Sequence, residues 1–226
     1  MKRYIQATRL FFGSRPEKCL LVFLVIDVGF AALILFSGLL GFDSGKDFFS
    51  GMLQGMSVAV GMSGVTYLGA LYNLTSPETP GYKYFSVIPD GVRQFRRAVV
   101  VANVLSIVTG IVMTAILWAV CAVAGADIIG LGLGVLLLPF ATGMMNFTGF
   151  IQRKAAKLAV FMSILMIGGF VGGFFTGMSE ESEGSSLPEL ISGNSLVIGL
   201  TVVSVLVFAG GLVFALVMAG RKRGAE

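Results

Sequence analysis

The chain has 226 residues, of which 56% are hydrophobic and only 12% are charged. Because a soluble domain usually has about 25% charged residues, this composition excludes an ordinary globular protein. The net charge is +4 at pH 7, but no basic stripe lies on a soluble domain, so we expect no nucleic-acid partner.

Six long apolar runs dominate the sequence, and each could cross a hydrocarbon core of about 30 Å as a helix. Helices satisfy their own backbone hydrogen bonds in lipid, whereas barrel strands would be about 10 residues long and alternating in polarity. The sequence therefore predicts an all-α integral membrane protein with six transmembrane helices. In chain order the runs are Leu20–Leu40, Met52–Tyr72, Ala98–Gly125, Ile128–Phe150, Leu158–Met178 and Leu196–Met218.

Residues 1–18 precede the first run and have the pattern of an amphipathic helix lying at the membrane surface. The alternative is a frayed basic terminus. The first run contains Asp27 and lacks a small-x-small cleavage pattern, so we expect it to stay in the protein as a span. Residues 19–220 form one transmembrane domain with an inner link at 74–97 and an outer acidic link at 179–195. Residues 221–226 form a basic cytoplasmic tail.

Of the sixteen Lys and Arg residues, all but Lys46 lie on one side of the membrane that the six spans define. They occur in the N-terminal segment, in the link between spans two and three, in the link between spans four and five, and in the tail. Because cytoplasmic loops are enriched in Lys and Arg, both termini are predicted to be cytoplasmic.

Asp27 is the one ionisable residue well inside a span. A carboxylate at that depth costs several kcal/mol unless it is paired, hydrated or protonated, and no Lys or Arg occurs in any span. Gln54, Asn103 and Asn146 are candidate partners, and together with Asp27 they are candidates to line a translocation path. The competing interpretation is a structural carboxylate near the inner interface that Ser or Asn neighbours satisfy.

Small residues occur at close spacing in several spans. Gly61-Met62-Ser63-Gly64 resembles the GxSG motif of rhomboid proteases, but the chain has no His to act as a base, so we expect close helix contact there instead. Span five has two overlapping GxxxG pairs, formed by Gly168, Gly169, Gly172 and Gly173. This spacing is more typical of packing inside one bundle than of a dimer interface.

Several chemistries are excluded by residues that the chain lacks. The absence of His removes His metal sites and His proton relays, and two cysteines are too few for a metal cluster. No Walker A motif is present either. We therefore expect no catalytic residue, no metal site and no cofactor in this chain, and no enzymatic activity.

The most specific stretch is Tyr82–Arg97, which joins aromatic residues, a Pro-Asp turn and a basic run that leads into span three. Asp90 can cap the helix that follows it, since its negative charge suits a helix N-terminus. The aromatic residues predict a short helix on the inner surface whose apolar side meets a partner protein. The alternative is a segment that lies against lipid headgroups.

The segment Tyr84–Leu105, with the sequence YFSVIPDGVRQFRRAVVVANVL, resembles the inner link of type-2 ABC exporter permeases. In that family an aromatic-x-x-x-Pro turn leads into the third span through a basic helix. The six spans, the cytoplasmic termini and the N-terminal amphipathic helix fit the family along the whole chain. Small bacterial members export peptides, including antimicrobial and phenol-soluble-modulin-type peptides, or serve in self-immunity. One departure is the short outer link, where many members place re-entrant helices.

The resemblance implies that Phe85–Arg97 forms a coupling helix which docks into a cytoplasmic ATP-binding cassette subunit. It also implies a second permease subunit in a homodimer, a location in the bacterial cytoplasmic membrane, and binding of ATP and magnesium by the partner ATPase. The docking residues would be Tyr84, Phe85, Val87, Ile88, Pro89, Asp90, Arg93, Arg96 and Arg97.

Together these expectations describe the permease subunit of an ATP-driven exporter that moves amphipathic or hydrophobic cargo, such as peptides, by alternating access. An ion-coupled secondary carrier is the first alternative, although the chain has one buried carboxylate, no His and no apparent inverted repeat. The second alternative is a non-transporting immunity or assembly protein that uses the same scaffold.

Overall fold

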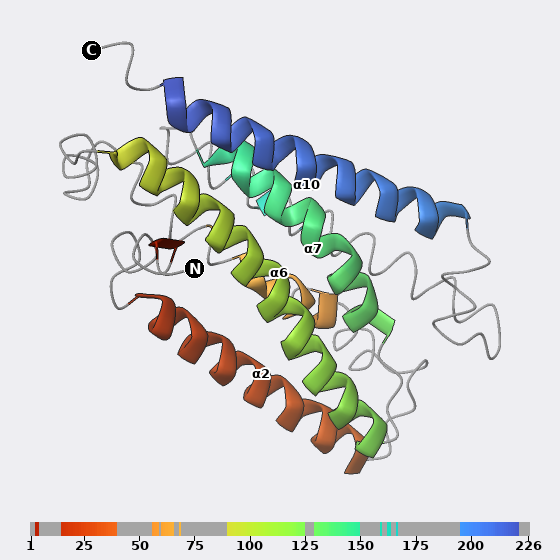
Figure 1. The fold of residues 1–226 in the computed structure, drawn as a ribbon. Helices are drawn as coiled ribbons and strands as arrows, with labels where there is room; N and C mark the ends of the chain where they lie inside the picture. The colour runs from red at the N-terminus through yellow and green to blue at the C-terminus, as the bar shows by residue number, and fades with distance from the viewer. Residues whose placement is uncertain are drawn as a thin grey trace.

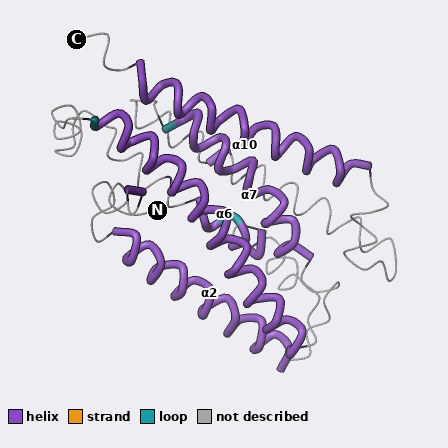
Figure 2. The backbone as a smooth tube through the Cα atoms, in the orientation of Figure 1, coloured by secondary structure: helices purple, strands orange, loops and turns teal. Residues whose placement is uncertain are grey.

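A computed structural model describes residues 3–4, 15–39, 56–58, 60–65, 68, 90–124, 129–149, 159, 162–163, 166 and 195–221. Within these ranges the structure is helical and contains no strand (Figure 2). The long helices are α2 (Arg15–Leu39), α6 (Gly91–Ala124), α7 (Ile129–Thr148) and α10 (Ser195–Arg221), and η1 (Ser63–Val65) is a short 3-10 helix. The prediction of an all-α chain is confirmed for the described residues.

Four of the six predicted spans coincide with long helices. Helices α2, α6 and α10 begin before their apolar runs, with α6 beginning at Gly91 and α2 at Arg15, whereas α7 lies within its run. The difference arises because an apolar run records where side chains suit lipid, whereas a helical backbone also continues through basic residues. Pro16 is compatible with the first turn of α2, where its missing N–H needs no partner.

Three of the long helices contain stretches long and apolar enough to cross a membrane: Gly91–Ala124, Leu131–Thr148 and Val197–Ala219. The described part of α2 contributes a shorter apolar stretch, Leu24–Phe36. Spans two and five are described only at scattered positions. The interfacial helix beyond Arg3 and Tyr4, and the outer acidic link, lie outside the described residues.

The helices lie side by side, with α6 between α2 and the pair formed by α7 and α10 (Figure 1). Helices α2 and α6 run in the same direction, and α7 and α10 run in the opposite direction (Figure 1). The start of α6, with Arg93, Arg96 and Arg97, therefore lies at the same end of the bundle as the last turn of α10 (Figure 1).

The packed interior of the described residues contains three apolar clusters. One joins Phe95 and Ala98 of α6 to Ala215 and Ala219 of α10. A second joins Val58, Met62 and Val65 to α7 and to Val197 of α10. The third joins α2 to the last turns of α6. Its buried members are Phe30, Ile34, Val60, Leu117, Cys121 and Leu131.

Glycines allow the helices to approach one another closely at two places. A Cβ atom placed on Gly61 would lie 2.8 Å from the Gly134 Cα atom in α7, and one placed on Gly64 would meet the Ser106 carbonyl oxygen in α6. The expectation that Gly61 and Gly64 serve close helix contact is confirmed. A second contact, which the sequence analysis did not identify, joins Gly143 of α7 to Gly211 of α10.

Candidate functional site

The first turns of α6 contain the described part of the proposed docking segment. Asp90 directly precedes the helix, and its backbone carbonyl accepts a hydrogen bond from the Gln94 N–H at 3.0 Å. Its φ of 61° is left-handed, whereas a usual N-cap residue is extended. Asp tolerates this conformation better than most residues. Asp90 therefore stands at the predicted helix boundary but in a different backbone conformation from an ordinary cap.

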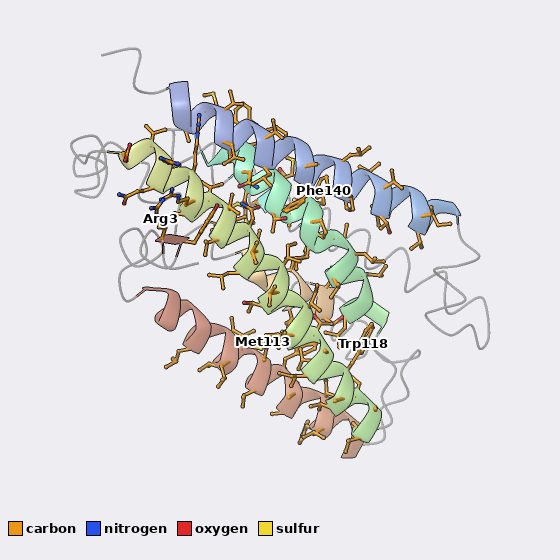
Figure 3. The ribbon with its side chains drawn as sticks, in the orientation of Figure 1. Arg3, Met113, Trp118 and Phe140 are labelled. Carbon is orange, nitrogen blue, oxygen red and sulfur yellow. The ribbon has the colours of Figure 1, made fainter. Side chains whose placement is uncertain are left out.

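Basic residues of these turns have different surroundings. Arg93 and Arg96 are exposed, and the Arg96 Nε donates a hydrogen bond to the Leu216 carbonyl of α10 at 2.9 Å. The Arg97 guanidinium lies 5.8 Å from the centre of the Tyr4 ring, a cation–π contact, and Figure 3 shows Arg3 beside this part of α6. Arg96 therefore connects α6 to α10 through a hydrogen bond, and Arg97 contacts Tyr4 in the N-terminal segment.

Asn103 and Asn146 form a buried amide pair between α6 and α7. The Asn146 Nδ2 donates to the Asn103 Oδ1 at 2.8 Å, and the Asn103 Nδ2 donates to the Asn146 Oδ1 at 3.3 Å. The Asn103 Nδ2 also donates to the Val99 carbonyl at 2.8 Å. These two predicted path residues are therefore brought together, but they bond to each other and neither is bonded to Asp27.

Asp27 is buried in α2, with 7% of its surface exposed, and both of its carboxylate oxygens lack a hydrogen-bond partner among the described residues. Within those residues, no Ser or Asn neighbour supplies the bond that the structural interpretation required. The Thr114 hydroxyl of α6 is likewise buried without a partner in the described ranges. Because burial of an unpaired polar group is costly, a ligand or a proton at Asp27 would lower the free energy of this buried carboxylate.

The described part of the second predicted span is an interrupted helix. Residues 60 and 61 are helical, Met62 forms a turn, and η1 follows. The Val65 N–H, which would bond to the Gly61 carbonyl in a continuous α-helix, instead donates to the Met62 carbonyl at 3.1 Å. Irregular backbone at membrane depth is tolerated where it is buried in protein, and here it lies against α6 and α7.

The remaining predicted site residues lie outside the described residues. These are Gln54 and the docking residues Tyr84, Phe85, Val87, Ile88 and Pro89. Sequence reasoning did not single out Thr114, since a Thr in an apolar helix is common. In the structure, Leu117 and Cys121 of α6 share a buried cluster with Phe30 and Ile34 of α2. Thr114 precedes Leu117 and Cys121 by the same intervals at which Asp27 precedes Phe30 and Ile34, and both Thr114 and Asp27 are buried.

In the described ranges, no three His, Cys, Asp or Glu side chains gather into a group that could hold a metal ion. Comparison of the chain with protein-family models, with curated proteins and with solved structures finds no match. The resemblance to exporter permeases therefore rests on the inner-link sequence and the arrangement of spans alone.

Proposed function

We propose that this chain is the permease subunit of an ATP-driven exporter in the bacterial cytoplasmic membrane. It would move amphipathic or hydrophobic cargo, such as peptides, out of the cell by alternating access between two copies of itself. The chain has no ATP-binding motif, so a cytoplasmic ATP-binding cassette subunit would bind ATP and magnesium. This chain would provide the path and the surface on which the ATPase acts.

The observation that carries the proposal is the continuity of α6 with the basic end of the inner link. Helix α6 has 34 residues, which corresponds to about 50 Å at 1.5 Å per residue. Its first turns expose Arg93 and Arg96, and farther along it holds Asn103 against α7. A displacement of the inner link by an ATPase would therefore pass along one helix to its contacts with α7 and α10.

Charge reversal of Arg93 tests the docking surface, because this side chain is exposed and makes no contribution to the core. We expect the Arg93→Glu variant to bind the ATPase at least about tenfold more weakly, since it would replace complementary charge with repulsion at the interface. The ratio of co-purified ATPase to permease after mild detergent extraction measures this effect. Membrane insertion should be unchanged.

Lys222→Glu, in the basic tail, is a matched control that changes the net charge equally and should retain the ATPase. Phe85→Glu and Ile88→Glu extend the test to the aromatic side of the segment, where a buried unpaired charge would weaken docking further. Wild-type amounts of ATPase with all three docking variants would contradict the proposal.

The buried, unpartnered Asp27 favours a second candidate function, an ion-coupled secondary carrier. The two functions differ in their energy source. Uptake or release driven by an ion gradient in proteoliposomes without ATP would support the carrier, and transport that requires the ATPase and ATP would support the exporter.

A further inference from the structure

We propose that Asp27, Thr114 and the interrupted segment Gly61–Val65 form a binding site for one small monovalent metal cation in the core of the bundle. The site is distinct from the docking surface and from the Asn103–Asn146 pair. It goes beyond the proposed function, because a permease with or without an ATPase partner could hold such an ion.

Asp27 and Thr114 occupy equivalent positions on two parallel helices that pack together. Helices α2 and α6 run in the same direction and pack together (Figure 1). Phe30 and Ile34 of α2 share one buried cluster with Leu117 and Cys121 of α6, and the residues in each pair are separated by the same interval. One turn earlier on the same face of each helix are Asp27 and Thr114.

The interrupted segment reaches the same level of the bundle. Val60 belongs to the cluster that contains Leu117, and the Gly61 carbonyl oxygen lies 3.3 Å from a Cβ atom placed on Gly110. Thr114 lies between Gly110 and Leu117 on α6, so this carbonyl is close to its level. Because the Val65 N–H bonds to Met62, the Gly61 carbonyl lacks its usual helical donor and can bind a cation.

The oxygen atoms of Asp27, Thr114 and the Gly61 carbonyl indicate which ion the site would bind. Carboxylate, hydroxyl and carbonyl oxygens are hard ligands that suit alkali and alkaline-earth cations. Asp27 supplies a single negative charge, and no Lys or Arg occurs in the predicted spans. A monovalent cation would neutralise that charge, whereas a divalent cation would leave an uncompensated positive charge in a region of low dielectric constant.

In the described ranges, two other buried hydroxyl groups without partners lie elsewhere. Ser106 is eight residues before Thr114 on α6, which is about 12 Å along the helix axis, and Ser204 lies on α10. Neither accompanies a carboxylate in the described part of the chain. Ser204 therefore provides a matched control, since its removal deletes a buried hydroxyl group without altering the proposed site.

Thermal unfolding of the purified full-length chain in detergent tests the site, with NaCl replacing choline chloride at constant ionic strength. Trp118, the chain's one tryptophan, is one turn from Thr114 on α6 and reports unfolding by its fluorescence (Figure 3). Because a ligand that binds only the folded state stabilises it, we expect a saturable rise in the unfolding temperature with NaCl. KCl titrated in the same way gives the preference between the two cations.

We expect Asp27→Asn to abolish the rise and Thr114→Val to weaken the apparent affinity at least about tenfold. Thr114→Ser retains the hydroxyl group and should keep the response, as should Ser204→Ala. If Asp27→Asn does not fold, the comparison of the two Thr114 variants still tests the site.

An equal salt response in Asp27→Asn or Thr114→Val would overturn the proposal. So would a wild-type protein that responds to pH but to neither salt, because a proton would then neutralise Asp27. Loss of the ATPase partner would not affect these outcomes, so a failure here is separate from a failure of the proposed function.

Discussion

At the scale of single residues, the polar groups of the core are of two kinds. Asn103 and Asn146 satisfy each other through two amide hydrogen bonds, so they stabilise the contact between α6 and α7. Within the part of the chain that the structure describes, Asp27 and Thr114 have no such partners. Buried polar groups usually have hydrogen-bond partners. We therefore expect the satisfied amide pair to be structural, and we expect Asp27 and Thr114 to bind a ligand.

A double-mutant cycle tests the structural role of the amide pair. Asn103→Leu should destabilise the protein by about 1–2 kcal/mol, because it leaves the Asn146 amide buried with fewer hydrogen bonds. Replacement of both residues by Leu should cost less than either single change, since neither polar group then stays unpaired. Reversible unfolding in mixed micelles measures these free energies. Strictly additive losses in the double variant would show that the two side chains do not interact.

At the scale of helices, close approach depends on glycine at a few positions. A Cβ atom on Gly143 would meet the Val207 carbonyl oxygen and lie 2.7 Å from the Phe208 nitrogen. These are backbone atoms of α10, which cannot move aside as a flexible side chain can. By contrast, a Cβ atom on Gly199, also in α10, would meet nothing within 4 Å.

We therefore expect Gly143→Ala to destabilise the protein by about 1–3 kcal/mol through overpacking between α7 and α10. Gly199→Ala should leave the stability unchanged or raise it slightly, since Ala favours helix more than Gly does. The unfolding temperatures of the two variants measured in the same detergent give the comparison. Equal temperatures would show that α7 and α10 are not as closely packed as the structure has them.

At the scale of the whole molecule, the long helices differ in how much they bury. Of the most apolar window of each helix, 61% is buried in α7, but only 28% in α6 and 22% in α10. Their exposed faces consist of large apolar side chains such as Val108, Ile116, Val202 and Leu206. In water such faces would drive aggregation, whereas lipid or a second permease subunit would cover them at little cost.

Single-cysteine labelling tests the orientation of this arrangement. In a background with Cys19→Ser and Cys121→Ala, Arg93→Cys should react with an impermeant maleimide only after the cells are permeabilised. Val123→Cys, at the opposite end of the same helix and highly exposed, should react in intact cells. This result follows from the cytoplasmic placement of the basic residues. Labelling of Arg93→Cys from outside would reverse the topology and remove the docking surface from the cytoplasm.

The sequence predicts most of what depends on local composition. It indicates the helices α6, α7 and α10 to within a few residues in their apolar parts, because a span must be long and apolar whatever its neighbours are. It also identifies the buried carboxylate and the contact at Gly61 and Gly64. Asp90 marks the start of the helix that precedes the third apolar run, and α6 begins directly after it at Gly91. The sequence does not predict that this helix is continuous with the third span.

The pairing of residues far apart in the chain was decided by the tertiary structure. The sequence offers Asn103 and Asn146 as partners for Asp27, whereas the fold joins the two amides to each other and leaves the carboxylate without a hydrogen-bond partner among the described residues. The contact of Gly143 with Gly211 has the same origin. A sequence fixes which side chains enter the membrane, through their transfer free energies. The rotation and register of packed helices, which depend on complementary shape over many contacts, decide which of those side chains meet.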